Sequence, residues 1–77
     1  MTPEQKALVG TWWNRGVNSS LRNRRCYLKE SKDAIREAEK LGWVRIIGEE
    51  SAAITRPAGI LFEFTKLGDV FFELEER

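Results

Sequence analysis

A change of hydrophobic period at Gly42 constrains the fold of this chain more than any other feature. The stretch EKLGWVRI, residues 39–46, passes from a charged run with helical spacing to a run of aromatic and β-branched residues. Glycine can adopt the left-handed conformation that ends a helix, and Trp43 and Val44 favour a pleated, half-buried surface. The sequence therefore predicts a helix that ends at Gly42 and a strand that begins at once and runs to about Gly48.

Size and residue content limit the chain to a small domain without covalent staples. The 77 residues are expected to form one domain, residues 1–77, near the lower size limit for a single hydrophobic core. Cys26 is the only cysteine and histidine is absent, so an intrachain disulfide and a zinc site of the Cys/His type are both excluded. No apolar run approaches the roughly 20 residues that a membrane helix needs, and Met1 leads directly into a polar segment. We therefore expect a cytoplasmic protein.

The first predicted helix covers residues 3–15. Thr2 is a hydroxyl N-cap, Pro3 suits the first helical position, and Gln5 can complete a capping box. Apolar side chains then recur at spacings of three and four residues and form one stripe, which consists of Leu8, Val9, Trp12 and Trp13. Gly16 is a natural stop. The two tryptophans are therefore expected to pack in the core.

The next segment permits two interpretations. A second helix is expected to begin near Leu21, with Asn18, Ser19 and Ser20 as alternative N-caps. Ser31 can cap a third helix, whose buried stripe would consist of Ala34, Ile35, Ala38 and Leu41. Apolar residues spaced seven apart also allow one longer helix over residues 20–40, namely Leu21, Leu28 and Ile35. We favour two helices with a turn near Lys29.

A hairpin is predicted in the second half of the chain. Residues 49–59 contain Pro57 and end in glycine, which indicates a loop or an irregular hairpin tip. The alternation in residues 60–64 predicts an antiparallel strand that returns beside the first. A two-stranded hairpin is marginally stable alone, so we expect it to pack against the helices.

The end of the chain returns to helical spacing and predicts a helix over residues 66–75, capped by Thr65. The expected buried stripe of this helix consists of Leu67, Val70, Phe71 and Leu74. Phe72 falls beside this stripe, which makes it a candidate for contact with another molecule.

The order of predicted elements resembles that of winged-helix regulators of the MarR and PadR type. The run AIREAEKLGWVRI is similar to a recognition helix that passes through glycine into the first wing strand, and FEFTKLG is similar to a second wing strand closed by Thr-x-x-Gly. The matching positions are Ile35, Ala38, Gly42, Trp43, Val44, Phe64, Thr65 and Gly68. The resemblance covers residues 21–74. It implies an α+β fold, a small winged helix-turn-helix domain with three helices, a two-stranded β-hairpin wing and a C-terminal helix.

The resemblance also implies double-stranded DNA as the partner. The N-terminal half of a recognition helix enters the major groove, and the wing contacts the backbone or the minor groove. The implied groove-facing residues are Lys29, Lys32 and Arg36, the implied phosphate contacts are Arg22, Arg24 and Arg25, and Arg56 lies in the wing. Independently, residues 1–32 contain seven basic and two acidic residues, which is typical of a surface that faces a polyanion.

Acidic residues on the same elements favour a second hypothesis. Glu30, Asp33 and Glu37 share the expected recognition helix, and Glu49 and Glu50 share the wing, so each of these carboxylates would repel a phosphate. A winged-helix module that binds or inhibits a host protein, and does not bind DNA, fits these charges. The interface with such a partner, or with a second copy in a homodimer, would use Trp12, Trp13, Phe71 and Phe72, together with Val70.

Enzymatic chemistry finds no support in the residues. The sequence has no histidine, no nucleophile with a neighbouring base, no glycine-rich phosphate loop and no metal-ligand constellation. We expect no cofactor and no small-molecule substrate. The sequence therefore predicts a small DNA-binding regulator or accessory factor of phage or mobile-element type, with the protein-binding module as the alternative.

Overall fold

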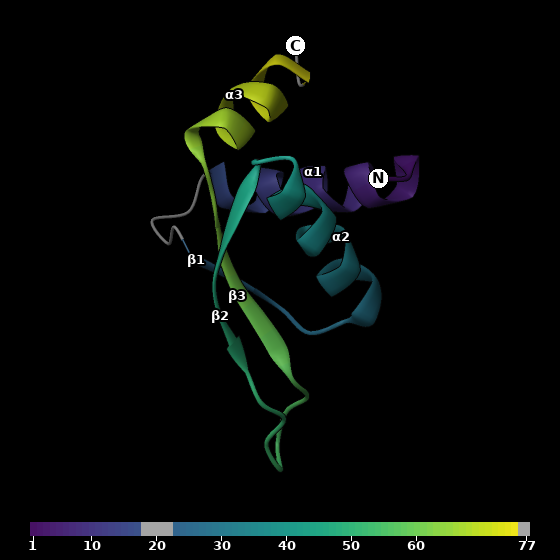
Figure 1. Cartoon of the computed structure of the whole chain (residues 1–77), viewed down its shortest axis with the longest axis vertical. Helices are drawn as coiled ribbons and strands as arrows, with labels where there is room; N and C mark the ends of the chain where they lie inside the picture. The colour runs from purple at the N-terminus through teal and green to yellow at the C-terminus, as the bar shows by residue number, and fades with distance from the viewer. Residues whose placement is uncertain (18–22, 76–77) are drawn as a thin grey trace.

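The computed structural model describes residues 1–17 and 23–75. Within these residues it has three helices and a three-stranded antiparallel sheet, which confirms an α+β fold (Figure 1). The elements in chain order are α1 (Pro3–Val17), β1 (Asn23–Cys26), α2 (Lys29–Lys40), β2 (Val44–Glu50), β3 (Gly59–Phe64) and α3 (Lys66–Glu75). No helix in this part of the chain is long and apolar enough to span a membrane.

The sheet has β3 at its centre, with β1 on one side and β2 on the other, and both neighbours run antiparallel to it. β2 and β3 form a hairpin whose tip lies at the opposite end of the molecule from α3 (Figure 1). A bulge between Ile46 and Gly48 interrupts the pairing of these two strands. α2 packs against both α1 and the hairpin.

Strand β1 occupies part of the region in which the sequence predicts a second helix, so that prediction is wrong over residues 23–26. Leu21, the expected start of the helix, lies outside the described residues. Pairing with β3 places Cys26 opposite Ile60, and both side chains are buried. Such tertiary pairing outweighs the weak helical signal of a polar run. The single helix over residues 20–40 is wrong for the same reason, and the predicted two-stranded hairpin gains a third strand.

Helix α2 begins at Lys29, where the sequence predicts a turn. Leu28 takes the N-cap position without a side-chain hydrogen bond, and Ser31 is buried inside the helix, so the prediction that Ser31 caps it is wrong. The predicted stripe is buried at Ala34, Ile35 and Ala38. Leu41 is exposed instead, because it follows the last helical residue as the C-cap.

The core lies between α1, α2, the sheet and α3. Its buried members are Val9, Cys26, Ala34, Ile35, Ala38, Val44, Ile60, Phe62 and Phe72. Trp12 and Trp13 pack against this core, as the sequence predicts. The ring centroids of Trp12 and Phe62 are 5.8 Å apart, and those of Trp13 and Phe72 are 6.1 Å apart.

The buried face of α3 differs from the predicted one. Gly68 and Phe72 point into the protein, and Phe72 is only 4% exposed. The predicted stripe is exposed at three of its four positions, Leu67, Val70 and Leu74. The cause is the close approach of Gly68 to Trp43, the residue before β2, since a Cβ atom on Gly68 would lie 2.0 Å from the carbonyl oxygen of Trp43. That approach fixes which side of α3 faces the core.

Hydrogen bonds at Thr65 cap α3 and join it to the junction of α2 and β2. The Thr65 amide donates to the Trp43 carbonyl oxygen at 3.0 Å, and the Thr65 hydroxyl donates to the Gly42 carbonyl oxygen. The Gly68 amide donates to the Thr65 hydroxyl oxygen at 3.1 Å, which confirms Thr65 as the helix cap. Gly42 has a φ of +82°, a conformation that favours glycine. The abrupt change from helix to strand at Gly42 therefore forms the surface on which α3 docks.

Candidate nucleic-acid interface

The three cations expected to face a DNA groove lie on one side of α2. Lys29, Lys32 and Arg36 are separated by three and four residues, so they project from neighbouring turns of the helix. Lys29 and Arg36 are exposed, and Lys32 is partly buried. This row faces away from the buried stripe of α2 and adjoins the hairpin.

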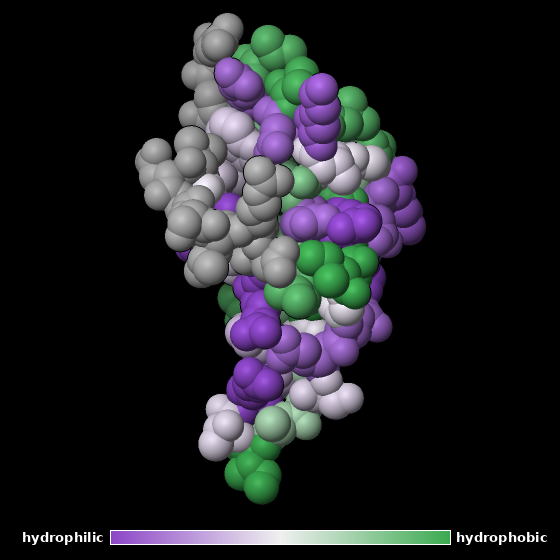
Figure 2. All heavy atoms as spheres, turned by 90° about the vertical axis from the view of Figure 1, so that its left-hand side faces the viewer, coloured by the Kyte–Doolittle hydropathy of each residue, from purple (hydrophilic) through white to green (hydrophobic). Residues whose placement is uncertain are grey.

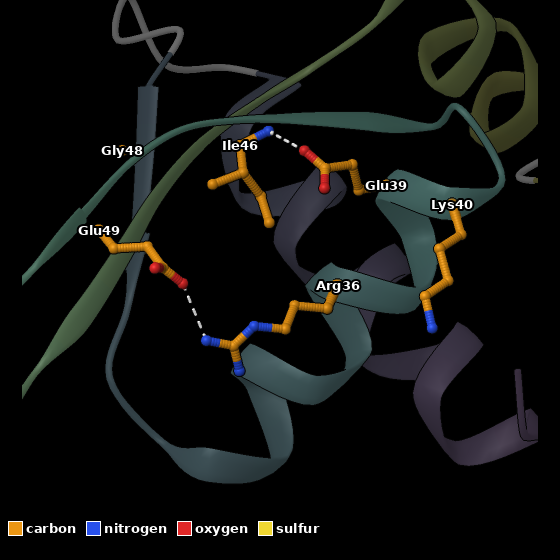
Figure 3. Close-up of a pocket in the computed structure, with 6 residues that line it drawn as sticks. All are labelled: Arg36, Glu39, Lys40, Ile46, Gly48 and Glu49. Atoms are coloured by element: carbon orange, nitrogen blue, oxygen red, sulfur yellow. Dashed lines mark hydrogen bonds and ion pairs between the residues drawn. The ribbon is translucent and has the colours of Figure 1, made fainter.

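Each cation of the row has a partner. The Lys29 ammonium lies 3.1 Å from a carboxylate oxygen of Asp33, and the Arg36 guanidinium lies 2.9 Å from one of Glu49 on β2. Lys32 donates a long hydrogen bond of 3.4 Å to the backbone carbonyl oxygen of Ala58. Arg36 and Lys32 therefore connect α2 to both sides of the hairpin, and Figure 3 shows Arg36 extended toward Glu49.

Two further arginines meet at Glu50, the last residue of β2. Arg25 on β1 lies 2.8 Å from one carboxylate oxygen of Glu50, and Arg56 beyond the hairpin turn lies 3.3 Å from the other. Glu50 shares a shallow pocket with Lys32, Arg36 and Glu49. We call these six residues the basic cluster: Arg25, Lys32, Arg36, Glu49, Glu50 and Arg56.

The remaining arginines of the predicted site do not join the basic cluster. Arg24 and Arg25 are neighbours on a strand, so their side chains point to opposite faces of the sheet. The Arg24 guanidinium lies against α1, where a Cβ atom on Gly16 would be 1.5 Å from it. Gly16, the predicted stop of the first helix, lies inside α1. Arg22 lies outside the described residues.

The charges on α2 balance. The helix KESKDAIREAEK carries four basic and four acidic residues. Three of its four cations, Lys29, Arg36 and Lys40, are held in exposed ion pairs. Such pairs contribute about 0–1 kcal/mol because water and salt screen them. A phosphate can therefore replace a carboxylate as the partner of Lys29 or Arg36 at small cost, although the displaced carboxylate still repels the phosphate.

An open groove runs between α2 and β2. Its lining consists of Arg36, Glu39, Lys40, Ile46, Gly48 and Glu49 (Figure 3). The Glu39 carboxylate accepts a hydrogen bond of 3.0 Å from the Ile46 amide, which lies on an edge strand of the sheet. Glu39 thereby covers part of an edge that could otherwise pair with another strand.

The buried cysteine offers no reactive group beside the basic cluster. Burial raises the pKa of the Cys26 thiol above its ordinary value of 9.0, although the positive charges of Lys32 and Arg36 oppose this rise. The thiol is therefore protonated at neutral pH and is a poor nucleophile. Within residues 1–17 and 23–75, no group of three acidic or cysteine side chains is placed to hold a metal ion.

The tip of the hairpin presents an apolar side chain that the sequence interpretation missed. Ala53 and Arg56 exchange backbone hydrogen bonds of 2.8 and 3.3 Å, so Ile54 and Thr55 form a two-residue turn. Ile54 is fully exposed there. Residues 49–59 were expected to form a loop or an irregular hairpin tip, and the structure has a hairpin tip here, with β2 continuing to Glu50 and a tight turn beyond it. The sequence does contain a sign of this exposed side chain, because Ile54 is the only large apolar residue in a run of small and polar residues, SAAITR.

The aromatic residues predicted for a partner or dimer interface lie in or against the core. Phe72 is buried, Phe71 stacks on Trp43 at 4.2 Å between ring centroids, and Trp12 and Trp13 are partly buried. Sequence spacing predicted the helices that carry these residues, but it did not show which side of α3 faces outward.

No protein-family model, curated protein or solved structure matches the chain.

Proposed function

We propose that this chain is a small winged-helix DNA-binding protein, a transcriptional regulator or accessory factor of phage or mobile-element type. In this proposal the N-terminal half of α2 enters the major groove, and the β2–β3 hairpin is the wing. The observation that carries the proposal is the basic cluster, in which Lys32 and Arg36 of α2 meet the hairpin at Ala58 and Glu49, and Arg25 of β1 and Arg56 meet it at the neighbouring Glu50.

The order of elements around this cluster supports the proposal. α2 passes through Gly42 directly into β2, so the helix and the hairpin keep a fixed relation to each other. The cationic row of α2 lies beside the hairpin strands, and Arg56 lies near the hairpin tip. A duplex against α2 would therefore also meet the hairpin, as in winged-helix docking.

The chemistry of the cluster is suited to phosphate. Guanidinium groups bind a phosphate through two parallel hydrogen bonds, and each neutralised phosphate releases counterions. Glu49 and Glu50 must lose their arginine partners during binding, and they remain close to the duplex. We therefore expect a modest affinity that decreases steeply with salt.

The decisive variant removes two cations of α2. Lys32→Ala/Arg36→Ala should lower the affinity for a mixed-sequence duplex at least tenfold and reduce the dependence of the affinity on salt. The matched control is Lys6→Ala/Arg15→Ala, which removes the same charge from α1 and should retain most of the affinity. Fluorescence anisotropy at several salt concentrations measures both quantities, and circular dichroism checks the fold. An affinity and salt dependence unchanged in the α2 variant would overturn the proposal.

A protein-binding module that does not bind DNA is the second candidate. Two observations favour it, namely the balanced charge of α2 and the fully exposed Ile54 at the hairpin tip. An amide chemical-shift titration with duplex DNA separates the candidates. Shifts at residues 24–36 and near Arg56 that fade with salt support DNA binding, whereas no shifts at low salt support the protein-binding module.

A further inference from the structure

The outward side of α3 carries three large apolar side chains. Leu67, Val70 and Leu74 are 57%, 47% and 63% exposed. Their spacing of three and four residues places them in one row, on the side of the helix away from buried Gly68 and Phe72. We call this row the outer face of α3. Figure 2 shows apolar atoms exposed at this end of the molecule.

The outer face continues onto the end of α2. A methyl carbon of Leu67 lies 3.3 Å from the position that a Cβ atom on Gly42 would take, so Leu67 covers the junction of α2 and β2. Leu41, next to Gly42, is itself 48% exposed. Single exposed apolar residues are ordinary on a protein surface, but adjacent ones in a regular row are typical of an interface.

The charges of α3 only partly match its own dipole. A helix favours acidic residues in its first turn and basic residues in its last. The first turn of α3 contains both Lys66 and Asp69, its last turn contains no basic residue, and Glu73 lies near its end. Lys66 and Glu73 are two turns apart and flank the outer face on the same side.

This pattern is self-complementary in one orientation. When two identical helices pack antiparallel about a two-fold axis at Val70, the first turn of each lies beside the last turn of the other. Lys66 of one copy then faces Glu73 of the second, and Leu67 packs near Leu74 of the second. A parallel pair would instead bring like ends and like charges together.

We propose that the outer face of α3 is the contact between two copies of this chain, packed antiparallel around Val70. α3 has ten residues, so the contact is small and the dimer should dissociate on dilution. α3 lies at the opposite end of the molecule from the hairpin tip, so both hairpins stay exposed in the dimer (Figure 1). The proposal stands without DNA binding.

Sedimentation equilibrium over a hundredfold range of concentration tests the proposal. The wild-type chain should pass from monomer to dimer, and Val70→Glu should remain monomeric at every concentration. Ile54→Glu is the matched control, because it places the same charge on an equally apolar exposed residue far from α3 and should leave the dimer intact. A wild-type chain that is monomeric throughout, or a dimer that persists in Val70→Glu, would overturn the proposal.

Exchange of the two charges tests the antiparallel orientation. Lys66→Glu and Glu73→Lys should each weaken the dimer severalfold, and the double variant Lys66→Glu/Glu73→Lys should restore it. Failure of the double variant to restore the dimer, with circular dichroism unchanged, would overturn the antiparallel pairing. A titration of Val70→Glu with duplex DNA tests the proposed function separately from the dimer. If this monomeric variant still shows chemical-shift changes in α2, it retains the proposed function.

Discussion

The two ends of the molecule are held together by different kinds of interaction. At the helical end, Trp43 stacks on Phe71 with ring centroids 4.2 Å apart and meets Phe72 edge-on at 5.3 Å. At the hairpin end, Arg36 pairs with Glu49 at 2.9 Å, and Glu50 is shared by two arginines. Buried aromatic side chains are major contributors to stability, whereas each exposed ion pair contributes about 0–1 kcal/mol.

We expect this difference to separate stability from the proposed DNA binding. The aromatic contacts cannot open without loss of the core, but the ion pairs can exchange a carboxylate for another anion while the fold persists. Substitutions at the helical end should therefore lower the free energy of unfolding, and substitutions at the hairpin end should change binding and leave this free energy nearly constant.

The largest contrast is expected between two glycines. A Cβ atom on Gly68 would meet the Trp43 carbonyl oxygen at 2.0 Å, and backbone cannot yield as a flexible side chain can. Gly68→Ala should therefore lower the free energy of unfolding by about 3 kcal/mol or more. Gly48 in β2 has no atom within 4 Å of such a Cβ, so Gly48→Ala should remain within about 0.5 kcal/mol of wild type.

Urea unfolding, followed by tryptophan fluorescence and circular dichroism, measures both glycine variants. Similar losses in the two variants would show that the close approach of α3 to β2 does not control stability. A large loss of stability confined to Gly48→Ala would show that the hairpin end, and not the helical end, controls the free energy of unfolding.

A smaller loss is expected from the threonine that joins α3 to the α2–β2 junction. Thr65→Val keeps the shape of the side chain but removes the cap of α3 and the hydrogen bond to the Gly42 carbonyl oxygen. The free energy of unfolding should decrease by about 2 kcal/mol. Thr55→Val at the exposed hairpin turn is the control, and thermal unfolding should show little change in it. Equal melting temperatures for the two variants would contradict the role of Thr65.

The elements that were predictable from sequence are those with local causes. Thr2 and Gln5 exchange the hydrogen bonds of a capping box, at 2.8 and 3.1 Å, as their spacing predicts. The helix predicted over residues 66–75 is present with these bounds, and Gly42 ends α2 as expected. In each case the deciding interaction lies within a few residues of the chain.

The features that were missed depend on contacts between distant residues. β1 forms because residues 23–26 pair with β3, and the run NRRC carries no local sign of this partner. The buried face of α3 is set by Gly68 against Trp43. The spacing of Lys29, Lys32 and Arg36 correctly placed them on one side of α2, but the contact of Arg36 with Glu49 could not be read from spacing.

A change at the hairpin end should act on binding alone. Glu49→Gln removes the negative charge that holds Arg36, and it also removes a carboxylate close to the proposed DNA surface. The affinity for duplex DNA should increase about threefold, in keeping with the strength of one exposed ion pair, while stability stays within about 0.5 kcal/mol. Glu75→Gln on α3 is the control with the same charge change. Weaker binding by Glu49→Gln in anisotropy measurements would show that Glu49 instead positions Arg36 for DNA.

The smallest effect on stability is expected from the thiol of Cys26, which lies between the two ends of the molecule. Burial raises the pKa of Cys26 in the folded state, so the thiol loses its proton at a lower pH in the unfolded chain than in the folded one. Its contribution to stability is complete below the ordinary pKa of 9.0 and is lost as the pH rises through the folded-state pKa. Lys32 and Arg36 oppose the effect of burial, which keeps the loss small. Urea unfolding from pH 7 upward should therefore show a slightly steeper decrease for wild type than for Cys26→Ala, in which no thiol titrates. Parallel pH profiles for wild type and Cys26→Ala would indicate that the charges of Lys32 and Arg36 cancel the effect of burial on the pKa of Cys26. The cations beside the hairpin would then affect this pKa as strongly as the core does.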